Sequence, residues 1–220
     1  MKLNSILRSA LVGAALSATS LIANTVNISD TPFDGGKNGG EFYAETSAHG
    51  NFYTFCLENF THVSLPGTYN YTISDRAYAG GGDNHDPIGA GPAGDPLSAG
   101  TAWLYEQFFK GTLVDSDGVG NYNDNRSLNA GLLQEAFWTL EDEYNYGSNF
   151  YVNLVISHFG SSAAAFATVD ADSTRVQVMN LWDANGGDVQ SQLVYVPDSG
   201  MTAALLGLGL LSLAAFRRKL

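Results

Sequence analysis

The chain has 220 residues, with 10 Lys and Arg against 22 Asp and Glu, and its formal net charge is −12. Aromatic residues make up 12% of the chain and charged residues only 15%, a composition that favours a folded core over an acidic disordered chain. The negative charge argues against a nucleic-acid-binding protein, which needs a basic face against phosphates. The single cysteine excludes an intrachain disulfide and any Cys-x-x-Cys metal or redox site.

The N-terminus has the pattern of a secretory signal peptide. Lys2 and Arg8 come before an apolar run rich in small residues, which ends at Ala23. We expect signal peptidase to remove residues 1–23 and to leave an exported domain, residues 24–195. This domain contains 21 of the 22 acidic residues but only five of the ten cations, so it is strongly acidic.

Short runs rich in aromatic or alternating residues predict strands, and apolar residues at helical spacing predict helices. The predicted strands are Gly40–Ala44, Phe52–Glu58, Thr68–Ile73, Arg175–Trp182 and Val189–Tyr195, the last two joined as a hairpin. The predicted helices are Leu97 to about Lys110, Ser127 to Glu143, and Asn149–Phe166, with Ser98 as a candidate cap and Ala79–Asp95 as a loop. We therefore expect an α+β domain, with an antiparallel sheet or sandwich from both ends of the domain and two or three central helices.

The only thiol belongs to Cys56, in the sequence Phe55-Cys56-Leu57-Glu58. One interpretation is a buried small hydrophobic residue. The other is a functional group, because exported proteins tend to avoid an unpaired thiol unless it is buried or used.

The second predicted helix carries the sequence Gln134-Glu135-Ala136-Phe137-Trp138. Gln134 and Trp138 are four residues apart and so share one helix face. Because a tryptophan is large enough to favour burial, we expect this face, with Gln134, to pack against the rest of the domain.

These two segments, in this order, resemble the Cys–Gln thioester domains of Gram-positive surface adhesins. Those domains carry an aromatic-Cys-x-acid motif on a strand, here Phe55 to Glu58, and a Gln-x-Ala-apolar-Trp motif at a helix, here Gln134 to Trp138. The chain departs from the family in having Leu133 where Thr often stands, and only Gln107 loosely represents a further Gln motif. The resemblance implies that the Cys56 thiol attacks the Gln134 carboxamide, expels ammonia and leaves an internal thioester.

Around this bond, the resemblance implies that Phe55, Phe137 and Trp138 form dry walls against hydrolysis, with Glu58 and Ala136 as the remaining motif residues. A surface amine would then displace the sulfur and become linked through Gln134. The rival interpretation is an inherited fold without the bond, in which Cys56 packs as a core residue.

The segment between the first two helices carries oxygen-bearing side chains around glycines, at Asp115, Asp117, Asn121 and Asn123. Such residues suit Ca²⁺, but their spacing departs from an EF-hand loop and Asp, Asn and Gly also form turns. The turn is the simpler interpretation, and calcium is the one cofactor that the sequence suggests. No histidine, serine or acidic group forms a catalytic motif, so we expect no enzyme activity.

The C-terminus resembles the PEP-CTERM class of bacterial sorting signals in its Val-Pro-Asp-Ser-Gly variant. The motif is Val196-Pro197-Asp198-Ser199-Gly200, the uncharged run is Met201–Phe216, and the terminal basic cluster is Arg217, Arg218 and Lys219. The uncharged run predicts a membrane helix, and the cations after it favour the cytoplasmic side. The resemblance implies inner-membrane anchoring, cleavage near the motif by an exosortase-type transpeptidase, and transfer to the cell surface or medium.

Together, these patterns predict an exported, exosortase-processed surface or matrix protein, with an adhesin-like domain that attaches to an amine-bearing surface or matrix ligand. Two alternatives stay open. A non-covalent structural component of the extracellular matrix would need no reactive bond. A secreted polysaccharide hydrolase would need two carboxylates that converge in a cleft.

Overall fold

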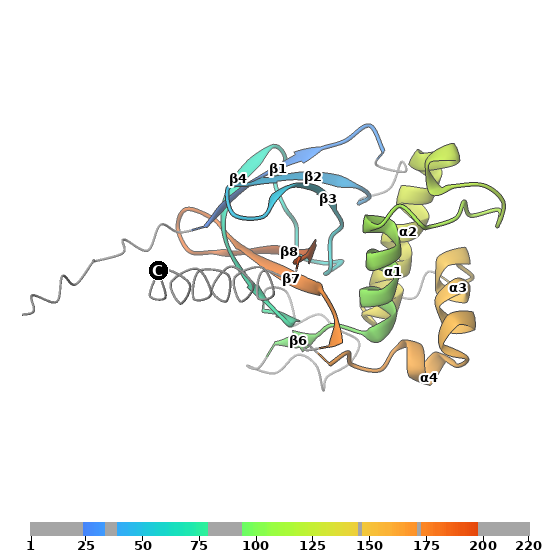
Figure 1. Cartoon of the computed structure of the whole chain (residues 1–220). Coiled ribbons are helices and arrows are strands. Elements are labelled where there is room, and N and C mark those ends of the chain that lie inside the picture. The colour runs from blue at the N-terminus through green and yellow to red at the C-terminus, as the bar shows by residue number, and fades with distance from the viewer. Residues whose placement is uncertain (1–23, 34–38, 79–93, 145–146, 171–172, 198–220) are drawn as a thin grey trace, which may run out of the picture.

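The computed structural model describes residues 24–33, 39–78, 94–144, 147–170 and 173–197. It confirms the α+β prediction: a curled antiparallel sheet lies against a group of helices (Figure 1). The sheet strands come from both ends of the described chain, and the helices come from its middle. The predicted signal peptide and membrane helix lie outside the described residues.

The main sheet has six strands in the order β3-β2-β1-β4-β7-β8, and every neighbouring pair is antiparallel. The strands are β1 (Thr25–Asp30), β2 (Phe42–Thr46), β3 (Gly50–Thr54), β4 (Gly67–Ser74), β7 (Val176–Trp182) and β8 (Asp188–Tyr195). A separate two-stranded ladder pairs β5 (Arg76–Ala77) with β6 (Asp95–Pro96). The predicted hairpin is confirmed as β7–β8, and its turn is held by Asp183 Oδ1, which accepts the backbone N–H groups of Asn185 and Gly187.

Strand β1 is a central strand that the sequence analysis did not predict. It pairs with β2 on one side and β4 on the other, and its Val26 and Ile28 are buried. The alternation of buried and exposed residues in Thr25–Asp30 is the period of two expected for a strand. The segment was missed because it directly follows the expected signal cleavage site.

The sheet curls until the chain after β3 meets β8. Thr54 Oγ1 donates to the carbonyl oxygen of Leu193 at 2.6 Å, Leu193 N donates to Phe55 O at 3.1 Å, and Leu57 N donates to Ser191 O at 3.0 Å. The predicted strand Phe52–Glu58 therefore ends earlier, at Thr54, and its last residues form a seam against β8. We call residues Thr54–Glu58 and the facing part of β8 the seam.

The helices are α1 (Ala99–Phe109), α2 (Arg126–Leu140), α3 (Phe150–Phe159) and the short α4 (Ser162–Ala165), with a 3₁₀ turn, η1 (Tyr122–Asn125), before α2. Ser98 caps α1, as predicted, by accepting Thr101 N at 3.1 Å. The predicted helix Asn149–Phe166 is divided because Gly160 adopts a left-handed φ of 77°, which ends α3. The second helix ends at Leu140, before a left-handed Asp142.

Two hydrophobic clusters form the core. One lies between the sheet and the helices and contains Phe55, Leu57, Phe137 and the buried faces of α1, α2 and α3. The other lies inside the curl of the sheet and contains Cys56, Trp138 and buried residues of all six strands of the main sheet. We call them the helix core and the curl core. Among the residues that the structure describes, no helix combines the length and apolar character needed to span a membrane.

Candidate functional site

Cys56 lies on the seam, and its side chain is 1% exposed. Side chains alternate along an extended segment. Phe55 and Leu57 accordingly join the helix core, whereas Cys56 joins the curl core. An antiparallel bridge pairs Cys56 with Gln192 of β8, so the thiol is held where the two ends of the curled sheet meet.

Gln134 of α2 contacts Cys56 through the backbone of the cysteine. Cys56 N donates to Gln134 Oε1 at 2.9 Å, and Gln134 Nε2 donates to Cys56 O at 2.7 Å. The Gln134 side chain is fully buried, as expected from the helix face that it shares with Trp138. The structure therefore brings the two predicted residues together. The amide of Gln134 fixes the backbone of Cys56, much as a neighbouring strand would.

The Cys56 sulfur itself faces two other glutamines, both from β8. The thiol donates to Gln190 Oε1 at 2.8 Å, and Gln192 Nε2 donates to the sulfur at 3.5 Å. Gln190 and Gln192 are two positions apart, so a strand presents them on the same side. Both are at most 4% exposed. The sulfur is thus contacted by two carboxamides from β8, whereas the carboxamide from α2 contacts the backbone of Cys56.

Glu58 completes this cluster. Its Oε2 accepts Ser191 N at 2.7 Å, and its backbone carbonyl accepts a short hydrogen bond from Gln190 Nε2. Its Oε1 is buried and has no hydrogen-bond partner among the described residues. Burial, reinforced by the charge of Glu143 and opposed by the hydrogen bonds from Ser191, raises the pKa of Glu58 to about 8. At neutral pH this carboxyl is therefore mostly protonated, and the cluster avoids a buried negative charge.

The thiol is also held in its neutral form. Burial raises the pKa of Cys56 far above its ordinary value, and the nearby Glu58 adds to this shift, while the hydrogen bond from Gln192 opposes it. A thiol in this state is protected from adventitious oxidation and alkylation, because the thiolate is the reactive form. Its chemistry depends on the groups placed next to it rather than on free thiolate.

A close backbone approach covers the Gln134 side of the cluster. A Cβ atom on Gly39 would meet Trp138 Cη2 at 2.6 Å and Gln134 Cγ at 2.9 Å, so only glycine fits there. Trp138 shares the curl core with Cys56. Phe55 and Phe137 pack on each other in the helix core, with ring centroids 5.2 Å apart, so they support the seam from its other side. Ala136 is buried in the same helix core.

Gln190 is the site residue that the sequence analysis missed. The motifs drew attention to Gln134 alone, and Val189–Tyr195 was interpreted only as half of a hairpin. A usable signal was present, because Gln190, Ser191 and Gln192 stand between the apolar residues Val189 and Leu193 in a predicted strand. Their burial at the seam could not be known before the sheet was seen to curl.

The segment proposed as a calcium loop uses its oxygens internally. Asp115 Oδ2 accepts Asn125 Nδ2 at 2.6 Å, Asp117 Oδ1 accepts Val119 N at 2.7 Å, and Asn121 Oδ1 accepts both nitrogens of Asn123 at 3.0 and 3.1 Å. These are the contacts of turns and helix caps. Elsewhere in the described chain, no three or more His, Cys, Asp or Glu side chains are grouped to hold a metal ion. The side-chain oxygens of this segment thus hold its turns together, and calcium binding there stays a prediction.

The acidic run at the end of α2 has separate structural roles. Glu141 accepts Ser98 N at 3.1 Å, Glu143 accepts Asn59 N at 3.3 Å, and Asp142 is exposed between them. The first two carboxylates thus bind different parts of the backbone. This arrangement lends no support to the hydrolase alternative.

The sorting motif begins where the sheet ends. Val196 N donates to Arg175 O at 2.8 Å, one residue after β8 finishes at Tyr195. Val196 and Pro197 are the last described residues. The rest of the motif and the basic cluster at Arg217, Arg218 and Lys219 lie outside the described part of the chain. The motif is therefore attached to the folded domain by a hydrogen-bonded strand end.

Comparison with known proteins identifies the tail but not the domain. Residues 195–220 match the VPDSG-CTERM motif. The searches of curated proteins and of solved structures found no match. The matched motif supports a PEP-CTERM-like sorting tail and implies an exosortase-like processing system. The matched motif therefore indicates an exported surface protein that is sorted through its C-terminus.

Proposed function

We propose that this surface protein attaches covalently to amines through an internal thioester formed by Cys56, and that Gln190 is the glutamine that reacts. The observation that carries the proposal is the 2.8 Å hydrogen bond from the Cys56 thiol to Gln190 Oε1 inside a closed, buried seam. The pairing of Cys56 with Gln134 as reacting partners stays a prediction. Gln134 is the supporting residue in our proposal, because its carboxamide is engaged at both ends by the Cys56 backbone.

The polar surroundings of Cys56 favour a functional thiol over a packed one. A cysteine that acts only as a small hydrophobic residue needs apolar neighbours. Here Glu58, Gln190 and Gln192 are buried around it, and Glu58 Oε1 and Gln192 Oε1 have no partner among the described residues. A buried polar atom without a partner costs about 1–3 kcal/mol of stability. Such an arrangement is typical of a site kept for chemistry, because an apolar core at the same place is more stable.

The reaction balances within the site. The sulfur attacks the carboxamide carbon of Gln190, a C–S bond forms and the C–N bond breaks. The thiol proton leaves with the nitrogen as ammonia, so no oxidant or other reactant is needed. Because the thiol is neutral, its proton must move as the sulfur attacks. The fixed geometry of the reacting groups lowers the barrier to this attack, because Gln134 holds the backbone of Cys56 and the carbonyl of Glu58 holds the Gln190 amide.

Attachment would follow when an amine attacks the thioester carbonyl carbon. The C–S bond then breaks, an amide forms through Gln190, and Cys56 regains its thiol. Burial protects the thioester from water until that step. The reaction occurs once per molecule, so the protein acts as a reactive adhesin and not as an enzyme. At the cell surface, the protein would meet amines on neighbouring surfaces or in the matrix.

The test is intact mass spectrometry of the purified full chain before and after treatment with methylamine. We expect a mass lower than that of the processed sequence by one ammonia, and a gain of one methylamine after treatment. The Cys56→Ala variant should show neither change. A full sequence mass together with a thiol that titrates freely after denaturation would overturn the proposal. That result would leave the non-covalent matrix component as the interpretation of this domain.

Peptide mapping of the methylamine-treated protein distinguishes the two glutamines. We expect the methylamide on Gln190, in the peptide that contains β8. A methylamide on Gln134 would keep the thioester but reassign its partner. The Gln107→Ala variant, altered at a half-buried residue of α1 that accepts a hydrogen bond from Thr112, serves as a matched control and should label like the unmodified chain.

A further inference from the structure

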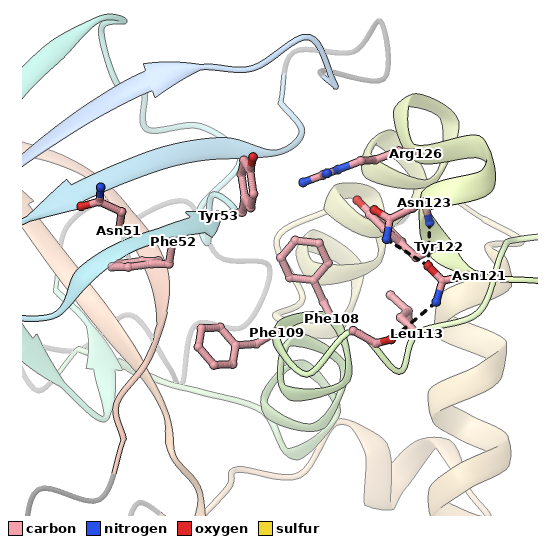
Figure 2. A pocket seen from close by; sticks show the side chains of 11 residues that line it. Asn51, Phe52, Tyr53, Phe108, Phe109, Leu113, Asn121, Tyr122, Asn123 and Arg126 are labelled. Atoms are coloured by element: carbon pink, nitrogen blue, oxygen red, sulfur yellow. Dashed lines mark hydrogen bonds between the residues drawn. The ribbon is translucent and has the colours of Figure 1, made fainter.

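A second site lies away from Cys56, between the outer edge of the sheet and the helices. It is a cavity of about 350 Å³ bounded by β3, the end of α1 and the segment from Asn121 to Arg126 (Figure 2). Its volume falls within the range of small-ligand pockets. Cys56 is not among its lining residues, so the cavity is separate from the thiol site.

Aromatic rings form much of its wall. Tyr53 is 37% exposed and Phe109 is 42% exposed, and Phe108 lies between them and Tyr122 (Figure 2). Tyr53 also lines a second hollow, of about 280 Å³, on the side of Tyr43 and Phe33. Two adjacent hollows that share an aromatic ring form a surface on which successive units of a chain molecule can stack.

The polar lining includes two carboxamides, those of Asn51 and Asn123, with unused hydrogen-bonding groups. The Asn51 side chain has no hydrogen-bond partner in the described chain, and Asn123 uses only its Nδ2, which donates to Asn121. A carboxamide both donates and accepts. The Tyr53 hydroxyl likewise has no recorded partner within the described ranges. Asn51 and Tyr53 belong to the β3 wall of the cavity, and Asn123 belongs to the helical wall (Figure 2).

The cavity carries no net charge. Arg126 is its only charged lining residue, and the guanidinium donates to both oxygens of the buried Glu41 carboxylate. The same group lies over the rings of Phe33 and Tyr53, 4.3 and 4.5 Å from their centroids. A charged ligand of either sign would lose its hydration in this neutral pocket without meeting an unpaired opposite charge. The cost of desolvation therefore disfavours charged ligands.

We infer that this cavity binds a neutral saccharide chain. A sugar ring offers an apolar face of C–H groups, which stacks on aromatic side chains, and hydroxyls that donate and accept as carboxamides do. Arg126 Nη1, which makes no recorded hydrogen bond in the described part of the chain, adds a donor for a hydroxyl oxygen. The inference does not depend on the thioester, because the two sites share no residue.

The test is isothermal titration of the purified full chain with cellohexaose, maltohexaose and chitohexaose, with hexagalacturonate as the acidic comparison. We expect at least one neutral hexasaccharide to bind. Asn51→Ala should raise its Kd about tenfold and Tyr53→Phe several-fold, while the control Asn185→Ala, in the β7–β8 turn, leaves it unchanged. The Cys56→Ser variant should bind equally well, which separates this site from the proposed thioester.

Three results would overturn the inference: no binding of any neutral hexasaccharide, binding of hexagalacturonate alone, or a Kd that neither pocket variant changes. Asn51 is an exposed side chain without a structural hydrogen bond, so its variant should keep the melting temperature of the parent. Tyr53→Phe keeps the ring and removes only the hydroxyl. Loss of binding in these variants would therefore report on the pocket and not on folding.

Discussion

The Cys56 thiol and the Gln190 carboxamide are joined by a hydrogen bond of 2.8 Å across the seam of the curled sheet. Gln134 lies on the other side of the same cysteine and binds only its backbone. The two glutamines thus have separable roles, one beside the sulfur and one beside the peptide group. Substitutions at the two positions should therefore affect different properties of the protein.

Gln134→Ala should destabilise the fold. It removes both hydrogen bonds to the Cys56 backbone and leaves a buried N–H and a buried C=O without partners, at about 1–3 kcal/mol each. We expect a loss of about 2–5 kcal/mol in the free energy of unfolding, measured by urea denaturation. Gln107→Ala, which removes one solvent-exposed hydrogen bond from Thr112, should change it by no more than about 1 kcal/mol. Equal effects in the two variants would contradict the assigned role of Gln134.

Cys56→Ser should keep the fold but lose methylamine labelling. A serine hydroxyl can donate to Gln190 as the thiol does, so we expect a cost of only about 1–2 kcal/mol. An oxygen ester at this site would not form at a comparable rate, because a hydroxyl is the weaker nucleophile. Thermal unfolding and intact mass, read on the same sample, check the two halves of this prediction. A labelled Cys56→Ser protein would show that the thiol is not the reacting group.

Stability should fall as pH rises from about 5 to above 8. Burial raises the pKa of Glu58 to about 8 and that of Glu141 to about 7, from an ordinary value of 4.5. The folded state therefore holds protons that the unfolded state releases. This contribution is fully present below pH 4.5 and is lost as pH rises through 7 and 8. Melting temperatures at pH 5 and pH 8.5 measure the difference.

Glu58→Gln and Glu141→Gln should each reduce that pH dependence, because neither amide titrates. Glu106→Gln, at the surface pair with Lys110, is the matched control and should leave it unchanged. If both buried variants kept the full difference in melting temperature between pH 5 and pH 8.5, groups other than Glu58 and Glu141 would have to cause that difference.

Arg126→Met should be strongly destabilising, by about 3–5 kcal/mol, because it leaves the fully buried Glu41 carboxylate with only the Tyr122 hydroxyl at 3.2 Å as a side-chain partner. The double variant Arg126→Met with Glu41→Gln should recover part of this loss. Arg76→Met, at the more exposed pair with Asp75, should cost no more than about 1 kcal/mol. Urea denaturation of the four chains forms the comparison. A double variant no more stable than Arg126→Met alone would contradict the buried-charge explanation.

Features that depend on local patterns could be predicted from the amino-acid sequence. The sorting tail is contiguous, so Val196 to Lys219 could be interpreted without a fold, and the comparison supports it. The helix with Gln134 and Trp138 was predicted from its period and ends within three residues of the expected position. Its buried face also followed from that period, because residues four apart share one side of a helix.

The groups that surround the thiol depend on the tertiary structure. Gln190 and Gln192 face Cys56 because the sheet curls until β8 meets the chain after β3, and no local pattern encodes such a long-range closure. The same holds for Glu41 and Arg126, which pair across the domain, and for the cavity that Arg126 helps to line. The two-residue period of a strand determines which of its residues share a face. The packing of the whole chain determines which other residues that face contacts.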